Sequence, residues 1–315
     1  MRRLFQFAVS AAGGVAAWSS VAAADISVVV TIKPLHALVS QVMSGVGTPA
    51  LLVQGSASPH TYALKPSDAR ALNRTDLFFR MSEAVEPFTA KIVRSLPKSV
   101  EVVTLQEAPG LKLLPRRTSS TFERHVHGKG ATHNHGPSRS SQPIDGHVWL
   151  DPDNARVMVD RIEQALSARE PAKTSVFKAN ADTLRSRFDT LSAELDRALR
   201  PVADAPFVVF HDAIQYLERR YGLNGVGSVS MSPEIPASAK RLSELRTKIA
   251  SLGAVCVFAE PQFDMRLIAN LTEGTRARTG TLDPEGGRLE PGPDLYFTLM
   301  RRLAEDLKGC LSAPS

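Results

Sequence analysis

The sequence predicts an α/β protein built from two parallel-sheet lobes that are joined by one long rigid helix. Strand-like and helix-like segments alternate along most of the chain, which is typical of parallel sheets wrapped by helices. The alternation occurs on both sides of a helix-like stretch over residues 172–200, which Pro171 and Pro201 bracket. A length of 315 residues leaves room for an apolar core in each lobe.

The first residues have the features of a secretory signal peptide. Arg2 and Arg3 precede an apolar run, and three alanines come directly before Asp25. The run is too short and too rich in Gly and Ala for a membrane span, although a retained N-terminal anchor is the alternative. No cysteine lies near the cleavage point to carry a lipid. We therefore predict a signal peptide over residues 1–24 and a periplasmic location.

The N-terminal lobe is predicted over residues 25–170. Its strands are the runs ISVVVTI, ALLVQG, DLFFRMS and VEVVTL. Helices are expected after Pro34, in PSDARALNR with Ser67 as N-cap, and in VEPFTAKIVRSL. The segment WLDPDNARVMVDRIEQAL reads as a strand end followed by an amphipathic helix.

Residues 115–145 interrupt this alternation. The segment is polar, rich in Gly and Ser and nearly free of aliphatic side chains, so it is predicted to be a mobile loop. It contains four histidines, namely His125, His127, His133 and His135.

The linking helix is predicted over residues 171–201 and the C-terminal lobe over residues 202–315. At about 1.5 Å per residue the helix would be ~43 Å long. Its apolar stripe consists of Leu184, Phe188, Leu191, Leu195 and Leu199. The strands expected after it are FVVFH, NGVGSVS, AVCVFAE and RTGTLD, each followed by a helix-like segment.

Charge and cysteine content narrow the class of protein. The net charge is +6, and subtracting Arg2 and Arg3 leaves +4. Acidic residues are interleaved with the basic ones on the helices, so we expect solvated helix faces and no nucleic-acid partner. The two cysteines, Cys256 and Cys310, are predicted to form a disulfide in an oxidising compartment, worth roughly 4 kcal/mol, with two buried free thiols as the alternative.

Three histidines carry the chemistry of the chain. His60, His147 and His211 each follow a short β-like run, and parallel strands bring the residues after them to one edge of a sheet. A ligand held by all three would lie between the lobes. Imidazole suits zinc, copper, nickel and iron, and three nitrogens with at most one carboxylate favour zinc. Asp283, or a water, is the candidate fourth ligand.

Taken singly, each of these histidines has the alternative of being a hydrogen-bonded core or surface residue. His36 either lines the pocket or caps its own helix, and we do not count it as a ligand. Glu260 is a candidate acceptor for the second N–H of a ligating histidine. A zinc hydrolase is a further alternative, but HExxH and GxSxG are both absent. We predict that the protein is not an enzyme.

Several segments together resemble a known family. They are TIKPLHALVSQVM, GSASPHTYALKPSDARAL, DGHVWLDPDNA, FVVFHDAIQYLERRYGL, CVFAEPQF and GTLDPEG. The chain resembles the cluster A-I substrate-binding proteins of ABC transporters, and among them the high-affinity periplasmic zinc-binding type. The resemblance covers nearly the whole mature chain. It implies two α/β lobes bridged by a rigid helix, a metal at their interface and delivery of that metal to a membrane permease.

The resemblance also implies roles for single residues. It makes His60, His147 and His211 the metal ligands, and it matches Asp283 to an aspartate that coordinates the metal in some members. The manganese-binding members have a carboxylate at the position of His211, which again favours Zn²⁺. The segment with HVH and HNH resembles the family's histidine-rich loop, so it either collects zinc or is an inert linker. We expect a monomer that binds Zn²⁺; manganese or another divalent metal is the alternative.

Overall fold

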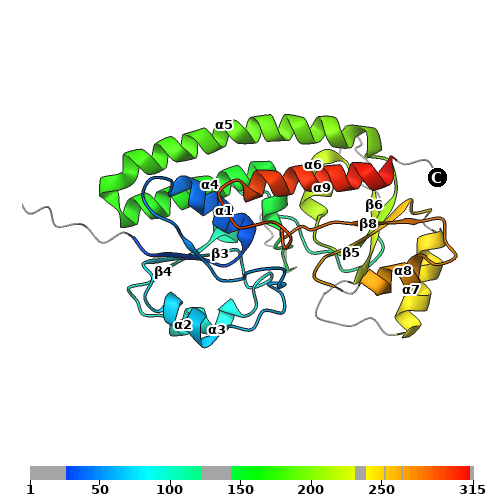
Figure 1. The fold of residues 1–315 in the computed structure, drawn as a ribbon, viewed down its shortest axis with the longest axis horizontal. Helices are drawn as coiled ribbons and strands as arrows, with labels where there is room; N and C mark the ends of the chain where they lie inside the picture. Colours follow the sequence, from blue (N-terminus) through cyan, green and yellow to red (C-terminus); the bar gives the residue numbers. More distant parts are fainter. Residues whose placement is uncertain (1–25, 123–142, 231–238, 252, 264, 313–315) are drawn as a thin grey trace, which may run out of the picture.

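The computed structural model describes residues 26–122, 143–230, 239–251, 253–263 and 265–312, and within them eight strands form two parallel sheets of four strands each. The two sheets lie beside one another beneath a layer of long helices (Figure 1). All eight strands fall inside the segments that the sequence predicts. The predicted fold class is therefore confirmed.

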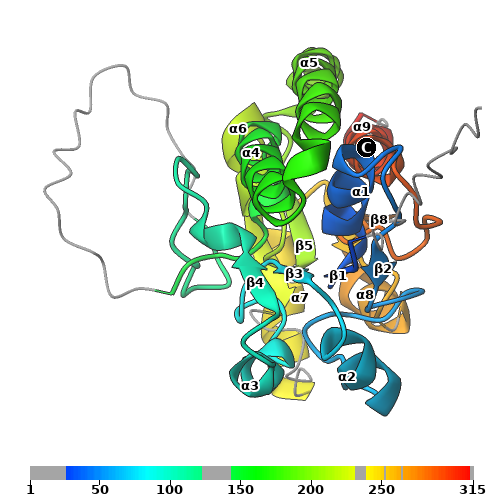
Figure 2. The ribbon, with the colours of Figure 1, turned by 90° about the vertical axis from the view of Figure 1, so that its left-hand side faces the viewer.

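The N-terminal lobe is the sheet with the order β2-β1-β3-β4 and its helices. Its strands are β1 (Val28–Val30), β2 (Ala50–Leu51), β3 (Leu77–Arg80) and β4 (Glu101–Thr104). Helices α2 (Pro66–Leu72) and α3 (Thr89–Ser95) cover one face, and α1 (Lys33–Val42) and α4 (Pro152–Arg169) cover the other (Figure 2). A short 3₁₀ turn, η1 (Leu105–Glu107), follows β4. Neighbouring residues of β1 point to opposite faces: Val28 and Val30 pack towards α1, and Val29 packs towards α2 and α3.

The C-terminal lobe repeats this arrangement with the strand order β6-β5-β7-β8. Its strands are β5 (Phe207–His211), β6 (Gly225–Ser230), β7 (Cys256–Ala259) and β8 (Arg278–Thr281). Helices α7 (Ala239–Ser251) and α8 (Met265–Thr272) cover one face, and α6 (Gln215–Tyr221) and α9 (Leu295–Leu311) cover the other. Because both faces are covered, the central strands β5 and β7 are buried along their whole length.

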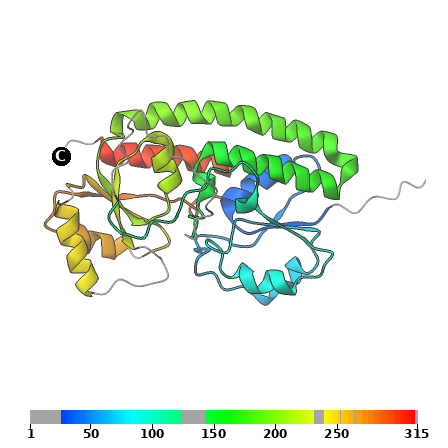
Figure 3. The same ribbon diagram turned by 180° about the vertical axis from the view of Figure 1, so that it is seen from behind.

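Helix α5 (Thr174–Leu199) spans both lobes and lies at the top of the view in Figure 3. Its 26 residues correspond to about 39 Å, and two 3₁₀ turns, η3 (Pro171–Lys173) and η4 (Arg200–Val202), flank it. The predicted apolar stripe from Leu184 to Leu199 is buried against α1, α4 and α9. One apolar cluster therefore extends from the N-terminal sheet through the helix layer to the C-terminal sheet.

The predicted disulfide is confirmed. Cys256 and Cys310 are bonded, and their Cα atoms lie 6.3 Å apart. The bond joins the first residue of β7 to the last turn of α9. It therefore fixes the C-terminal helix to the middle of the second sheet.

The described ends of the segment over residues 115–145 are ordered, so the prediction of a mobile loop is wrong for these ends. Pro115 forms an isolated antiparallel bridge with Ile144, and Thr121 forms one with Gly227 of β6. Residues 115–122 therefore lead from the N-terminal lobe to the edge of the C-terminal sheet. The predicted histidines His125, His127, His133 and His135 lie outside the described residues.

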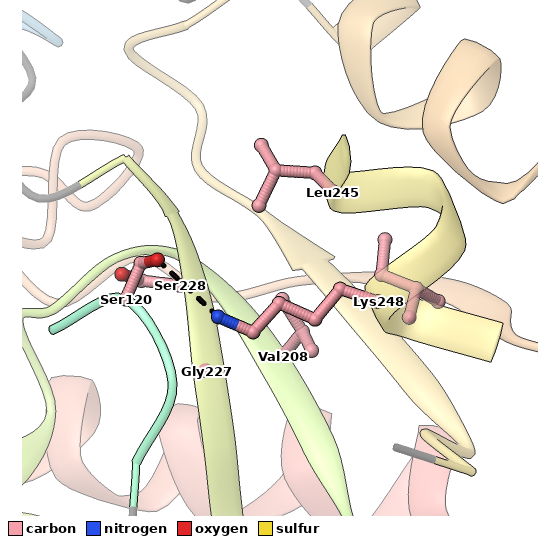
Figure 4. A pocket seen from close by; sticks show the side chains of 7 residues that line it. Ser120, Val208, Gly227, Ser228, Leu245 and Lys248 are labelled. Carbon is pink, nitrogen blue, oxygen red and sulfur yellow. Dashed lines mark hydrogen bonds between the residues drawn. The ribbon is translucent and has the colours of Figure 1, made fainter. Parts of the chain in front are cut away.

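Long-range side-chain contacts fix this segment. The Arg117 guanidinium contacts Asp212 at 2.8 Å and Glu218 at 2.5 Å; the two acidic side chains are buried and that of Arg117 is mostly buried. Figure 4 shows Lys248 of α7 reaching Ser120, with the two side chains 3.4 Å apart. A polar composition does not prevent order where such partners are available.

Two further predictions concern chain ends and caps. The predicted signal peptide, residues 1–24, lies outside the described residues. No helix in the described part of the chain combines the length and the apolar character that crossing a membrane requires.

The prediction of Ser67 as the N-cap of α2 is wrong. Helix α2 already begins at Pro66, and the carboxylate of Asp68 accepts the Lys65 backbone N–H.

Candidate metal site

The three histidines that were predicted to bind metal lie in segments of different secondary structure. His60 lies in the loop between β2 and α2, and His211 is the last residue of β5. His147 directly precedes the 3₁₀ turn η2 (Val148–Leu150), which leads into α4. The prediction that each histidine follows a strand is therefore correct for His211 only. The other two are placed by loops.

The three imidazoles meet at one point. The Nε2 atom of His147 lies 3.3 Å from that of His60 and 3.3 Å from that of His211. Each of the three residues offers one ligand atom to a cluster whose atoms all lie within 4.8 Å of one another. All three residues are buried. Two of them belong to the N-terminal lobe and one to the C-terminal lobe, so the cluster bridges the lobes.

Carboxylates on the outer side of two rings set their orientation. Asp145 accepts from Nδ1 of His147 at 2.7 Å, and Glu260 accepts from Nδ1 of His211 at 2.5 Å. Each carboxylate also accepts the backbone N–H of the same histidine. A carboxylate at Nδ1 favours the tautomer with the proton on that nitrogen, which leaves the Nε2 lone pair directed into the cluster, as metal ligation requires. The predicted hydrogen bond between Glu260 and one of these histidines is confirmed, whereas Asp145 was missed, although the spacing in DGH is a usable signal.

Gly146 permits this arrangement around His147. A Cβ atom at Gly146 would lie 2.4 Å from a methyl carbon of Val85 and 3.1 Å from the Ser82 hydroxyl. The segment with Asp145 and His147 therefore passes against the loop after β3 at a distance that only glycine allows.

The protonation states differ among the histidines. Burial, followed by the charges of the other two histidines and Arg116, lowers the pKa of His60 to about 2. Burial also holds the pKa of His147 well below its usual range. For His211, burial acts in the same direction, but the charge and hydrogen bond of Glu260 outweigh it and raise the pKa. At neutral pH the site thus offers two neutral imidazoles beside a His211–Glu260 pair.

Glu285 is a buried carboxyl group at the edge of this cluster. Its Oε1 lies 3.9 Å from Nε2 of His60, and its Oε2 has no hydrogen-bond partner among the described residues. Burial, followed by the charges of Glu260 and Asp283, raises its pKa well above the ordinary value. A buried carboxyl group without a partner, close to the lone pairs of the histidines, is an arrangement that a cation would satisfy. Sequence reasoning missed Glu285.

Asp283, the predicted fourth ligand, is not part of the cluster of ligand atoms. Its Oδ1 accepts the Gly287 backbone N–H at 2.9 Å, and its Oδ2 accepts that of Arg288 at 2.9 Å. These bonds use the carboxylate to fold the loop after β8. The Nε2 atom of His36 contacts the Pro49 carbonyl oxygen at 3.0 Å. This ring therefore does not cap its own helix, and it is not part of the histidine cluster.

The fold and the site together define a class of protein: a two-lobed α/β binding protein with a candidate metal centre between its lobes. Residues 28–310 match the family model described as zinc-uptake complex component A, periplasmic. The chain belongs to this family.

Similar proteins of known name agree with this assignment. The chain is 42% identical to the high-affinity zinc uptake system protein ZnuA of Brucella suis, over 93% of this chain and 94% of that protein. It is 35% identical to the protein of the same name from Paracoccus denitrificans, over 91% and 92% of the two chains.

Solved structures show the same fold. A crystal structure of ZnuA aligns with a TM-score of 0.74 at 20% identity, over 91% of this chain and 99% of that one. The periplasmic zinc-binding protein TroA of Treponema pallidum also aligns with a TM-score of 0.74 at 20% identity, over 92% and 100% of the two chains.

Proposed function

We propose that this protein captures Zn²⁺ in the periplasm with high affinity and delivers it to the membrane permease of an ABC transporter for import. The observation that carries the proposal is the convergence of three histidine Nε2 atoms across the boundary between the lobes. Family membership and the names of the relatives support the transport role. A metal held between two lobes is enclosed when they are together and released when they part.

The ligands in this proposal are His60, His147 and His211, each through Nε2. Two of the rings are kept neutral by burial, and neutral imidazole is the form that binds zinc. Three nitrogen donors favour zinc over manganese and magnesium, which prefer oxygen. Imidazole also suits copper and nickel, so competition between metals has to be measured.

A carboxylate is proposed for the fourth position, because tetrahedral zinc takes four donors. Our prediction was Asp283 or a water. The placement of the carboxyl groups favours Glu285, which lies 3.9 Å from His60, over Asp283, whose two oxygens accept backbone N–H groups of its own loop. X-ray absorption on zinc-loaded Glu285→Gln and Asp283→Asn proteins tests the choice. Loss of an oxygen ligand only in Asp283→Asn would favour the original prediction.

We propose a monomeric carrier without catalytic activity. A catalytic zinc keeps an open position and works with a general base beside a substrate cavity. The carboxylates closest to the cluster are instead used to orient His147 and His211. A hydrolysis assay on zinc-loaded protein checks this part of the proposal, and turnover that depends on the histidine cluster would contradict it.

Metal analysis tests the main proposal. The protein is stripped with a chelator and reloaded with zinc, manganese, copper or nickel in turn, and the stoichiometry and affinity are measured by elemental analysis and calorimetry. We expect one tightly bound Zn²⁺ at the cluster and weak binding of Mn²⁺. A strain that lacks the protein should grow poorly in low zinc and recover when zinc is added. Tight binding of manganese in preference to zinc would contradict the proposal.

A further inference from the structure

Lys33 links the two lobes beside the metal site. It is the first residue of α1 in the N-terminal lobe, and its side chain is buried. Its ammonium group donates to the carbonyl oxygens of Gly286 at 3.2 Å, Gly287 at 2.9 Å and Leu289 at 2.8 Å. These carbonyls belong to the loop between β8 and α9 in the C-terminal lobe. A lysine ammonium has three donors, so the loop uses all of them.

The loop that Lys33 holds also carries Glu285. Gly286 directly follows Glu285 and has a φ of +68°, so the chain turns sharply where Lys33 binds it. Within the loop, the Asp283 carboxylate accepts two backbone N–H groups and closes the turn from inside. The Lys33 ammonium binds carbonyl oxygens of the same turn from outside the loop. The position of the Glu285 carboxyl group near His60 therefore depends on a lysine of the opposite lobe.

The loops that carry His60 and His147 in the N-terminal lobe also contact the loop between β8 and α9. Ser56, four residues before His60, donates its hydroxyl to the Gly287 carbonyl oxygen at 3.1 Å. Trp149, two residues after His147, donates its indole N–H to the Pro284 carbonyl oxygen at 3.0 Å. Separating the lobes at the metal site breaks all of these bonds. Only the hydrogen bonds from Lys33 have a charged donor. When they break, the buried Lys33 ammonium loses its hydrogen-bond acceptors, which costs more free energy than the loss of a neutral bond.

We propose that Lys33 is a positioning residue that sets the residence time of the metal by holding the loop over residues 283–289 against the N-terminal lobe. It contributes no ligand atom. It acts through Glu285 and through the contact between the lobes, so it slows the departure of the metal more than it speeds its arrival. This inference rests on the proposed zinc site but assigns a separate role in release.

The main test compares Lys33→Met with the wild-type protein. Methionine keeps an apolar stem of similar length and removes every donor. Zinc dissociation is measured by stopped flow in excess chelator, and association is measured separately. We expect one bound zinc, an association rate close to wild type and a dissociation rate roughly 10-fold or more higher, the size expected when buried carbonyls lose a charged donor. Lys33→Gln, which keeps two uncharged donors, should fall between.

Controls separate positioning from general stability. Leu184→Ala removes a buried side chain from α5 and should destabilise the fold without accelerating zinc release. Lys98→Met changes an exposed lysine of the same lobe and should leave release unchanged. In metal-free protein, trypsin should cut after the exposed Arg288 faster in Lys33→Met than in either control.

The outcomes are distinguishable. Wild-type release rates in both folded Lys33 variants would overturn the inference. Equal acceleration in Leu184→Ala would overturn it as well, since the effect would then be one of stability. If the wild-type protein itself failed to bind zinc at the cluster, the proposed function would fall instead.

Discussion

The two lobes contain the same structural unit, a histidine whose Nδ1 contacts a buried carboxyl group, but the two units differ in charge. In the N-terminal lobe, burial lowers the pKa of His147 and raises that of Asp145 to about 7, so both members tend towards their neutral forms. In the C-terminal lobe, the charge of Glu260 overcomes burial and raises the pKa of His211. One half of the site therefore offers neutral nitrogen, and the other holds a proton more firmly.

The neighbours of each unit explain the difference. After burial, the charges that act on His147 are the positive ones of His211 and Arg116, which oppose its protonation. After burial and Glu260, the charges that act on His211 are those of Asp212 and Asp145, which favour its protonation. One hydrogen-bonding motif therefore supplies either a neutral imidazole or a titrating one, depending on the charges around it.

Removing a histidine of the cluster from either lobe should have the largest effect on zinc affinity. We expect His211→Ala and His147→Ala each to weaken zinc binding by more than the ~10- to 100-fold that outer contacts to ligands are worth. Calorimetry with a competing chelator measures the loss. His36→Ala is the matched control, because His36 is buried but lies outside the cluster. An unchanged affinity in His211→Ala would remove that residue from the site.

Changing the carboxyl groups tests the difference itself. Glu260→Gln should weaken zinc binding by roughly 10- to 100-fold, because the amide no longer supports the ring as a charged acceptor. Asp145→Asn should cost less, because a pKa of about 7 leaves this group partly protonated near neutral pH. The two affinities are compared at one pH and one ionic strength. Equal losses would mean that the two units do not differ in charge.

The pH dependence of zinc binding should reveal the titrating half. The raised pKa of His211 means that this ring takes up a proton first as the pH falls, and the proton competes with the metal. Titration of His211 alone should therefore lower the affinity by about 10-fold per pH unit below that pKa, with release of one proton per zinc bound. Glu285, whose pKa is raised well above its ordinary value, releases a second proton if it is the fourth ligand. His60 and His147 should add little until much lower pH, because their pKa values are lowered. Calorimetry in buffers of different ionisation enthalpy counts the protons, and a count above two would contradict the assignment.

The disulfide should have the smallest effect on the metal. It closes a loop with a sequence separation of 54 residues, for which the chain-entropy account gives roughly 4 kcal/mol of stability. Cys256 begins β7, whereas Glu260 follows its other end, so the bond lies away from the cluster. We expect Cys310→Ser to lower the free energy of unfolding by about that amount while the zinc affinity changes by less than about twofold. Denaturant unfolding and calorimetry on the same sample check both halves of this expectation.

Much of the fold was predictable because its strands are buried on both faces. Runs such as FVVFH and CVFA are continuously apolar, which only a covered parallel sheet requires, and the long stripe of α5 has an unbroken helical period. The ordered ends of residues 115–145 were not predictable from composition. Arg117 finds its partners Asp212 and Glu218 at sequence separations of 95 and 101, which no local pattern contains.

The convergence of the three histidines was more predictable than the residues that surround them. Histidine is rare in this chain outside residues 115–145, so His60, His147 and His211 stood out by residue type. Their surroundings depend on tertiary contacts: Glu285 reaches His60 because Lys33 holds the intervening loop, and Asp283 is used within that loop. Two acidic residues two positions apart cannot be ranked as candidate ligands by sequence, because only the turn decides which one lies beside the histidine cluster.

The apolar cluster that runs through the helix layer from one sheet to the other has a consequence for folding. Side chains of β1, α5 and β5 all belong to it. Each sheet has a smaller apolar cluster of its own on the opposite face, but the larger part of the core of both lobes is shared. Two lobes with separate hydrophobic cores unfold one after the other, whereas lobes that share a core unfold together. The protein should therefore denature in a single cooperative transition, and neither half should persist as an isolated fragment.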